Sequence, residues 1–157
     1  FKFIYPYLRY FELNEYDVVL NNIEKNLKEY ISFGFENMCK ESLPCLVKGY
    51  PLIGKWWGHC RDKNGERKEL EIDIVALNEE KKQILFAKCK WKDEVDANKV
   101  INELKEKARF VEWNNNKRKE FYVVFAKSFK SKKIEEKNVL LFDLKDIRKI
   151  YIVDNKV

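Results

Sequence analysis

Apolar residues in the first third of the chain recur at spacings of three and four, as they do on one side of a helix. This spacing predicts an amphipathic helix over residues 16–31, marked by Val18, Val19, Ile23, Leu27 and Ile31. We expect Ser32 and Gly34 to interrupt that helix. A second helix is predicted over residues 35–43, and Pro44 should end it because proline cannot continue a helical hydrogen-bond ladder.

The middle of the chain has the patterns of extended strands instead. Residues 46–61 contain Gly and Pro breaks and lead into a predicted turn at residues 62–66. The segment 70–77 (LEIDIVAL) alternates, so Leu70, Ile72 and Ile74 should share one face and Glu71, Asp73 and Val75 the other. Residues 78–82 should form a hairpin turn, and the short apolar run 84–91 (ILFAKCKW) is predicted to be the next strand.

The last third adds a long helix and two more apolar strands. We predict a helix over 94–113, loops over 114–119 and 127–137, strands over 121–126 and 138–144, and a last short helix from 146 to 153, capped by Asp143 or Asp146. This order indicates an α/β fold, with a central mixed sheet of four or five strands flanked by helices.

The length and composition fit a single folded domain with a helical extension. The 157 residues are 45% hydrophobic, enough for a substantial core. No apolar run approaches the roughly 20 residues of a membrane span, and no signal peptide is visible, so we expect a cytoplasmic protein without a membrane partner. The chain starts at Phe1, and FKFIYPYLRYFEL reads as interior sequence, which suggests a piece of a longer polypeptide.

A basic charge balance suits a polyanionic partner. Thirty-two Lys and Arg against 26 Asp and Glu give a net charge of +6 and an isoelectric point of about 9.0. Neutralising phosphates releases counterions and supplies most non-specific affinity for nucleic acid, so DNA is the expected partner. The alternative is an ordinary solvated surface, and the lysine-rich loop 127–137 fits either interpretation.

The cysteines do not have the spacing of a zinc site. Cys39, Cys45, Cys60 and Cys89 form no CxxC pair, and the single histidine, His59, adds too few ligands. We interpret the cysteines as small apolar side chains in a reducing compartment.

One set of charged residues matches metal-dependent phosphodiester chemistry. Glu71 and Asp73 lie on one predicted strand, Lys88 and Lys90 on the next, and Glu36 on the helix before the sheet. Oxygen ligands of this kind hold Mg²⁺, which polarises a phosphate and activates water, while a lysine orients that water.

These residues also carry a resemblance to a known superfamily. The run EIDIVALNEEKKQILFAKCKW resembles the core motif of the PD-(D/E)xK nucleases, which share the restriction-endonuclease-like fold. Together with YPLIGKWWG it is similar to the C-terminal domain of archaeal P-loop (AAA-type) ATPases, where an ATPase domain and a winged helix precede a nuclease-like domain. FKFIYPYLRYFE resembles the segment that joins the two parts. The similarity extends over residues 1 to about 113.

The resemblance implies a division of the chain and a partner. Residues 1–31 would be a helical linker, and residues 32–157 the nuclease-like domain. The ATPase domain of the same polypeptide would be a partner, and oligomer formation is left open. The chain itself contains no GxxxxGK[ST] motif, so it should not bind nucleotide in the P-loop manner.

The resemblance also assigns roles to individual residues. Asp73 matches the first metal-binding aspartate, Lys90 the motif lysine, and Glu71 a second acid, so these three would be the catalytic set. Asp73, Glu71 and Glu36 would be the ligands of Mg²⁺. The departure is Lys88, which stands where the motif has Glu or Asp.

We hypothesise that Lys88 acts as a built-in counterion to Asp73 and that the metal site is degenerate. Two rearrangements could rescue a metal site: Glu94 could move in, or Glu71 could act with Glu36. DNA contacts are predicted for Lys55, Trp57, Lys92 and Lys130, although a Trp56–Trp57 pair is more often buried in a core.

Three functions remain open from the sequence: a DNA-binding domain with a degenerate site, an active Mg²⁺-dependent endonuclease with a rearranged site, or a docking or oligomerisation module of the ATPase. The departure at Lys88 favours the first and the third.

Overall fold

The chain divides into two compact units, Phe1–Asn37 and Met38–Val157. The computed structural model describes residues 5–61 and 64–153, so the first two residues of the predicted turn at 62–66 lie outside the described residues. The predicted functional boundary between residues 31 and 32 stays a prediction. Within the described residues, no helix combines the length and apolar character that a membrane span requires.

The first unit is helical, as the pattern of its apolar residues predicts. A short 3-10 turn η1 (Tyr5–Tyr7) leads into α1 (Leu8–Glu12), and α2 (Tyr16–Leu46) follows and continues into the second unit. The Asn26 amide donates a hydrogen bond to the Tyr7 hydroxyl over 2.8 Å, tying α2 to η1. Many apolar side chains of this unit are exposed, among them Leu8, Leu20, Leu27, Tyr30 and Phe33.

The prediction of two helices separated at Ser32 and Gly34 is wrong, because α2 is continuous and includes Pro44. A helical glycine costs only about 1 kcal/mol relative to alanine. Pro44 lies in the last turn, where the bond it removes is one of the last of the ladder. Cys39 and Leu43, four residues apart on the helix, are fully buried, and this packing outweighs both losses.

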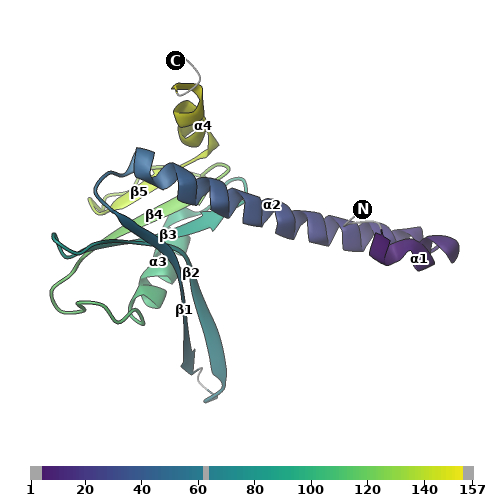
Figure 1. The fold of residues 1–157 in the computed structure, drawn as a ribbon, viewed down its shortest axis with the longest axis horizontal. Helices are drawn as coiled ribbons and strands as arrows, with labels where there is room; N and C mark the ends of the chain where they lie inside the picture. The colour runs from purple at the N-terminus through teal and green to yellow at the C-terminus, as the bar shows by residue number, and fades with distance from the viewer. Residues whose placement is uncertain (1–4, 62–63, 154–157) are drawn as a thin grey trace. The chain divides into compact units, whose positions relative to one another are not determined.

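The second unit is built on a five-stranded mixed sheet (Figure 1). The strands lie in the order β1-β2-β3-β4-β5, with the first two pairings antiparallel and the last two parallel. Their bounds are β1 Leu52–Arg61, β2 Arg67–Asn78, β3 Gln83–Lys90, β4 Lys119–Ala126 and β5 Val139–Phe142. Parallel neighbours need a crossover connection, which α3 (Ala97–Ala108) supplies between β3 and β4. This mixed α/β architecture is the predicted fold class and is consistent with a restriction-endonuclease-like fold.

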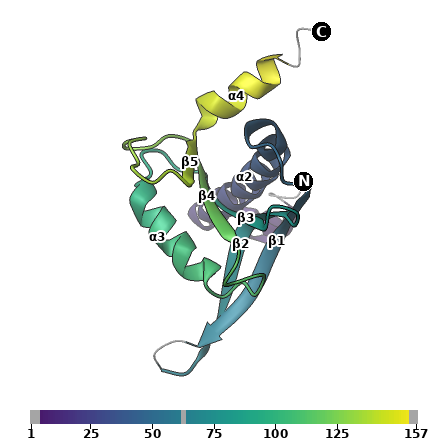
Figure 2. The same cartoon turned by 90° about the vertical axis from the view of Figure 1, so that its left-hand side faces the viewer.

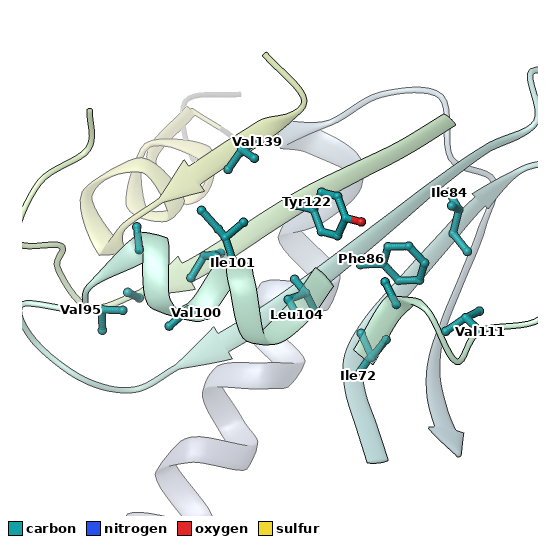
Figure 3. Packing of buried hydrophobic residues seen from close by; sticks show 14 residues of the cluster. Ile72, Ile84, Phe86, Val95, Val100, Ile101, Leu104, Val111, Tyr122 and Val139 are labelled. Carbon is teal, nitrogen blue, oxygen red and sulfur yellow. The ribbon is translucent and has the colours of Figure 1, made fainter. Parts of the chain in front are cut away.

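The main core lies between α3 and one face of the sheet (Figures 2 and 3). The helix presents a stripe of Val100, Ile101 and Leu104 to Phe86 of β3 and Tyr122 of β4. The stripe that the sequence periodicity predicts is Val100, Leu104, Ala108 and Val111, all of which lie in this core; Ile101 is added by the structure. The helix is shorter than the predicted 94–113, because the Asp96 side chain accepts the Lys99 N–H and caps its first turn.

The C-terminal end of α3 is fixed by a buried arginine. The Arg118 guanidinium donates to the carbonyl oxygens of Ala108, Val111 and Trp113, over 2.6–3.0 Å, and pairs with the Glu120 carboxylate. These bonds tie the last residue of the helix to the loop that follows it. The chain therefore leaves the helix at Ala108, five residues before the predicted end.

The last helix, α4 (Leu144–Val153), has the predicted acidic cap. Asp143 Oδ1 accepts the N–H groups of Lys145 and Asp146, while Asp146 Oδ2 accepts the Asp143 N–H. This reciprocal arrangement is a capping box. Lys132 bridges both carboxylates at 2.8 and 2.5 Å.

Candidate functional site

The candidate site lies where β2 and β3 separate. The two strands pair from Asn78 and Gln83 as far as Ile74 and Ala87, and beyond that point β3 continues beside β4 alone. After Ala87, the backbone groups of β3 on the side of β2 therefore need hydrogen-bond partners other than the backbone of β2.

A β-bulge in β2 lies at the same place. Gly54 of β1 pairs with Val75 and Trp56 pairs with Ile72, so β2 has one residue more than β1 between these pairs. Because paired residues point to the same side of a sheet, Ile72 and Val75 share a face and Ile74 points the other way. The prediction that Ile72 and Ile74 share a face is therefore wrong, since a regular alternation cannot show a bulge.

Asp73 is in the bulge and fills the gap between the strands. Its side chain is only 1% exposed. Its Oδ2 accepts the backbone N–H of Cys89 over 2.7 Å, which gives β3 the partner that β2 no longer supplies. Its Oδ1 lies 2.5 Å from the ammonium of Lys88, whose side chain is 22% exposed. The carboxylate is thus held by one neutral and one charged donor.

Glu71 lies close to Asp73 but has a different partner. Carboxylate oxygens of the two residues lie within 4.8 Å of each other. Glu71 forms an ion pair with Lys55 of β1. The Lys55 ammonium lies 5.9 Å from the ring centroid of Trp57, whose side chain is exposed (69%). Trp56, by contrast, packs partly against the core. The tryptophan pair is therefore divided between one core residue and one surface residue.

A residue that the sequence interpretation missed completes this region. The Lys107 ammonium donates to the backbone oxygen of Glu71 over 3.1 Å. Burial lowers the pKa of Lys107, and the charges of Lys88 and Lys90 lower it further, against the opposing effect of Asp73. Lys107 is therefore close enough to Lys88, Lys90 and Asp73 for their charges to shift its pKa.

A signal for Lys107 is present in the sequence. It follows Leu104 by three residues and precedes Ala108, so it lies beside the apolar stripe of α3 rather than on the solvent side. A lysine in that position must bring its ammonium to the edge of the sheet that the helix covers.

A pocket of about 270 Å³ lies next to the site, between the end of β3 and the start of α3. Two of the predicted DNA contacts, Lys92 and Lys130, line it together with the motif lysine Lys90. Its other charged residues are Glu94, Asp96, Lys99 and Glu103. The structure thus brings Lys90, Lys92 and Lys130 together. The predicted contacts Lys55 and Trp57 lie instead on β1.

Glu36 lies on α2 within the first compact unit. Its part in a metal site stays a prediction, as does the movement of Glu94.

The two acids beside the bulge, Asp73 and Glu71, already have cationic partners. Two carboxylates of β2 are paired with lysines, Asp73 with Lys88 and Glu71 with Lys55. A Mg²⁺ ion needs several oxygen ligands at about 2.1 Å and would have to displace both ammonium groups. The charge that a metal would supply is already present as lysine.

The fold and the site define a mixed α/β domain, consistent with the restriction-endonuclease-like class, in which a buried aspartate, Asp73, pairs with Lys88 of the neighbouring strand. The chain belongs to the family DUF234, described as "Archaea bacterial proteins of unknown function", whose model matches residues 1–101. It is 34% identical over 154 residues to the uncharacterized protein MJECL04 of Methanocaldococcus jannaschii. That match takes in 93% of this chain but 32% of the relative, so the chain spans about a third of the length of that protein. No solved structure matches.

Proposed function

We propose that this chain is a nuclease-like domain that binds DNA without cutting it, and that Lys88 takes the place of the missing metal ion. The observation that carries the proposal is the 2.5 Å contact between the Lys88 ammonium and the buried Asp73 carboxylate. A metal-dependent nuclease needs that carboxylate free to bind an ion.

Electrostatics favour this interpretation over an active nuclease. A buried carboxylate is costly unless an opposite charge or several donors compensate it. Lys88 and the Cys89 N–H already do so. A second cation at the same carboxylate would also be repelled by Lys88, Lys90 and Lys107. Lys88 and Lys90 already lower the pKa of Lys107 in this way.

The surface around the site supports binding to DNA. The pocket beside β3 is lined by four lysines, Lys90, Lys92, Lys99 and Lys130, and by three acids, Glu94, Asp96 and Glu103. On β1, Trp57 lies beside Lys55. Lysines can neutralise phosphates, and an exposed aromatic ring can stack on a base. We expect the affinity to fall steeply with salt.

We extend the proposal to the longer protein of which this chain would be a part. The relative is about three times as long as this chain, which leaves room for the ATPase and winged-helix parts that the sequence resemblance implies. In that setting the domain would position DNA for the ATPase of the same polypeptide. Docking against the ATPase is the second candidate, favoured by the exposed apolar residues of the first unit, such as Leu20, Leu27 and Phe33.

Plasmid nicking with added Mg²⁺ or Mn²⁺ tests the proposal, on the wild type, Asp73→Ala and Lys88→Glu in parallel. The wild type should not nick supercoiled DNA but should bind it in a salt-dependent manner. Lys88→Glu should gain stabilisation by Mg²⁺ in a thermal melt, because it restores a second acid beside Asp73. Lys81→Glu, an exposed hairpin lysine, is the matched charge control and should gain none.

Two results would count against the proposal. Nicking by the wild type that disappears in Asp73→Ala would show a working metal site. Absence of salt-dependent DNA binding would favour the docking module instead.

A further inference from the structure

We propose that Lys107 and Lys90 form a binding site for one backbone phosphate of DNA, beside the Lys88–Asp73 pair, so that DNA is held without a divalent metal. This inference rests on the proposed function and names the residues that hold the ligand.

The position of Lys107 is set by two contacts of the fold. It lies in the last turn of α3, which packs on the sheet face of Phe86. Its ammonium is fixed by the bond to the Glu71 carbonyl oxygen, over 3.1 Å. An ammonium has three N–H donors, so this bond leaves two for a ligand.

Lys90 comes to the same region from the strand. Lys88 and Lys90 are two residues apart on β3, so they share a face, and Lys88 pairs in register with Val124 of the α3-facing core. The charges of Lys88, Asp73 and Lys90 all act on the pKa of Lys107, after its burial. The helix lysine and the strand lysine therefore lie on the same side of the sheet and within range of each other.

The charges in this region are unbalanced. Lys88 is neutralised by Asp73, whereas Lys90 and Lys107 have no ion-pair partner within residues 5–61 and 64–153. Asp73 and Glu103 are the acids that offset part of this positive charge at Lys107. Two like charges held together, one of them partly buried, are unfavourable unless an anion lies between them. A phosphodiester carries one negative charge and accepts hydrogen bonds from both ammonium groups.

The neighbouring pocket indicates where the next phosphates would lie. Lys90 lines the 270 Å³ pocket that also contains Lys92, Lys99 and Lys130. The pocket is also lined by the acids Glu94, Asp96 and Glu103, so its four lysines exceed its acids by one charge. Lys90 belongs both to the proposed site and to this pocket, and lysines beyond the first phosphate favour a polymeric phosphate ligand over a free phosphate ion.

DNA binding in EDTA tests the inference. Fluorescence anisotropy of labelled double-stranded and single-stranded oligonucleotides would be measured for the 157-residue chain, Lys107→Gln and Lys90→Gln. Each variant should bind about tenfold more weakly, the loss of one charge-assisted hydrogen bond. The slope of log affinity against log salt should fall by about one. Added Mg²⁺ should not tighten binding.

Three controls separate binding from folding. Lys107→Arg keeps the charge and should retain most of the affinity. Lys117→Gln removes an exposed lysine of the loop after α3 and should bind like the wild type. Amine acylation followed by peptide mapping should show Lys107 and Lys90 protected by DNA and Lys81 unprotected, which a merely structural role would not produce.

The outcomes distinguish this inference from the function on which it rests. Salt-dependent binding by the wild type with unchanged affinity in both glutamine variants would overturn the phosphate site and leave the proposed function standing. Binding that needs Mg²⁺ would also overturn it. No binding by the wild type would overturn both.

Discussion

Two paired cations in the second unit, Arg118 and Lys88, have opposite surroundings. Arg118 is 4% exposed and donates to three backbone carbonyl oxygens, pairs with Glu120, and lies over the ring of Phe86 at 5.5 Å. Lys88 is 22% exposed and has one charged partner, Asp73, in a gap between strands. Both groups are compensated, but only Arg118 is compensated mainly by neutral groups of the chain around it.

This difference in partners indicates a different role for each of the two cations. The hydrogen-bonding partners of Arg118 come from residues 108–120, so it locks one helix end and the loop that follows. The partner of Lys88 is 15 residues away, on a different strand, and beside it lie two further lysines, Lys90 and Lys107, without ion-pair partners among the described residues. Excess charge of this kind does not help a core, and the proposed phosphate site would account for it.

The largest expected effect is at Arg118. Arg118→Met should destabilise the fold by about 3–5 kcal/mol, because Glu120 and the carbonyl groups of the α3 end lose their buried donor. Urea denaturation followed by circular dichroism measures this. Arg118→Lys should recover only part of the loss, since one ammonium cannot reach carbonyls that a planar fork spans. A loss below 1 kcal/mol would remove the distinction between the two cations.

A smaller effect is expected at Lys88, where Asp73 keeps the Cys89 N–H as a donor. Lys88→Met should cost about 1–3 kcal/mol, the range for leaving a buried acceptor short of a partner. Asp73→Asn in the same chain should recover part of it, giving a coupling energy of about 0.5–3 kcal/mol in a double-mutant cycle of urea midpoints. Additive losses would show that the two side chains do not compensate each other.

The fold was predictable where local pattern decides it. The apolar stripe of α3, the strands around residues 70–77 and 121–126, and the Asp143 cap all follow from spacing and turn chemistry. The continuity of α2 through Gly34 and Pro44 was not, because burial of Cys39 and Leu43 outweighs local preference. The early end of α3 depends on Arg118, which lies ten residues after Ala108.

The pairing of Asp73 with Lys88 could be predicted from the sequence, but the surroundings of this pair could not. The motif spacing brings Asp73 and Lys88 to neighbouring strands, and the structure shows them in contact. The bulge in β2 and the separation of β2 from β3 cannot be seen in an alternating pattern. Lys107 was missed because its role depends on how α3 packs over the sheet, which no spacing within residues 70–91 contains.

The smallest expected effect concerns a third charged group, the capping box of α4, where charges are both structural and solvent-accessible. Burial alone would raise the pKa of Asp146, but hydrogen bonds from Lys132 and from the Asp143 N–H outweigh it and lower the pKa below its ordinary value of 3.8. A depressed carboxyl pKa stabilises the fold above the unfolded value and is lost as pH falls through the folded one. Asp146→Asn should therefore cost about 0.5–1 kcal/mol at pH 7 and almost nothing near pH 2. Urea midpoints at both pH values measure this loss. Arg118→Met is the comparison, and its loss of stability should persist near pH 2, because most partners of Arg118 are backbone carbonyl groups, which do not titrate. An equal loss for Asp146→Asn at both pH values would mean that its contribution is packing rather than charge.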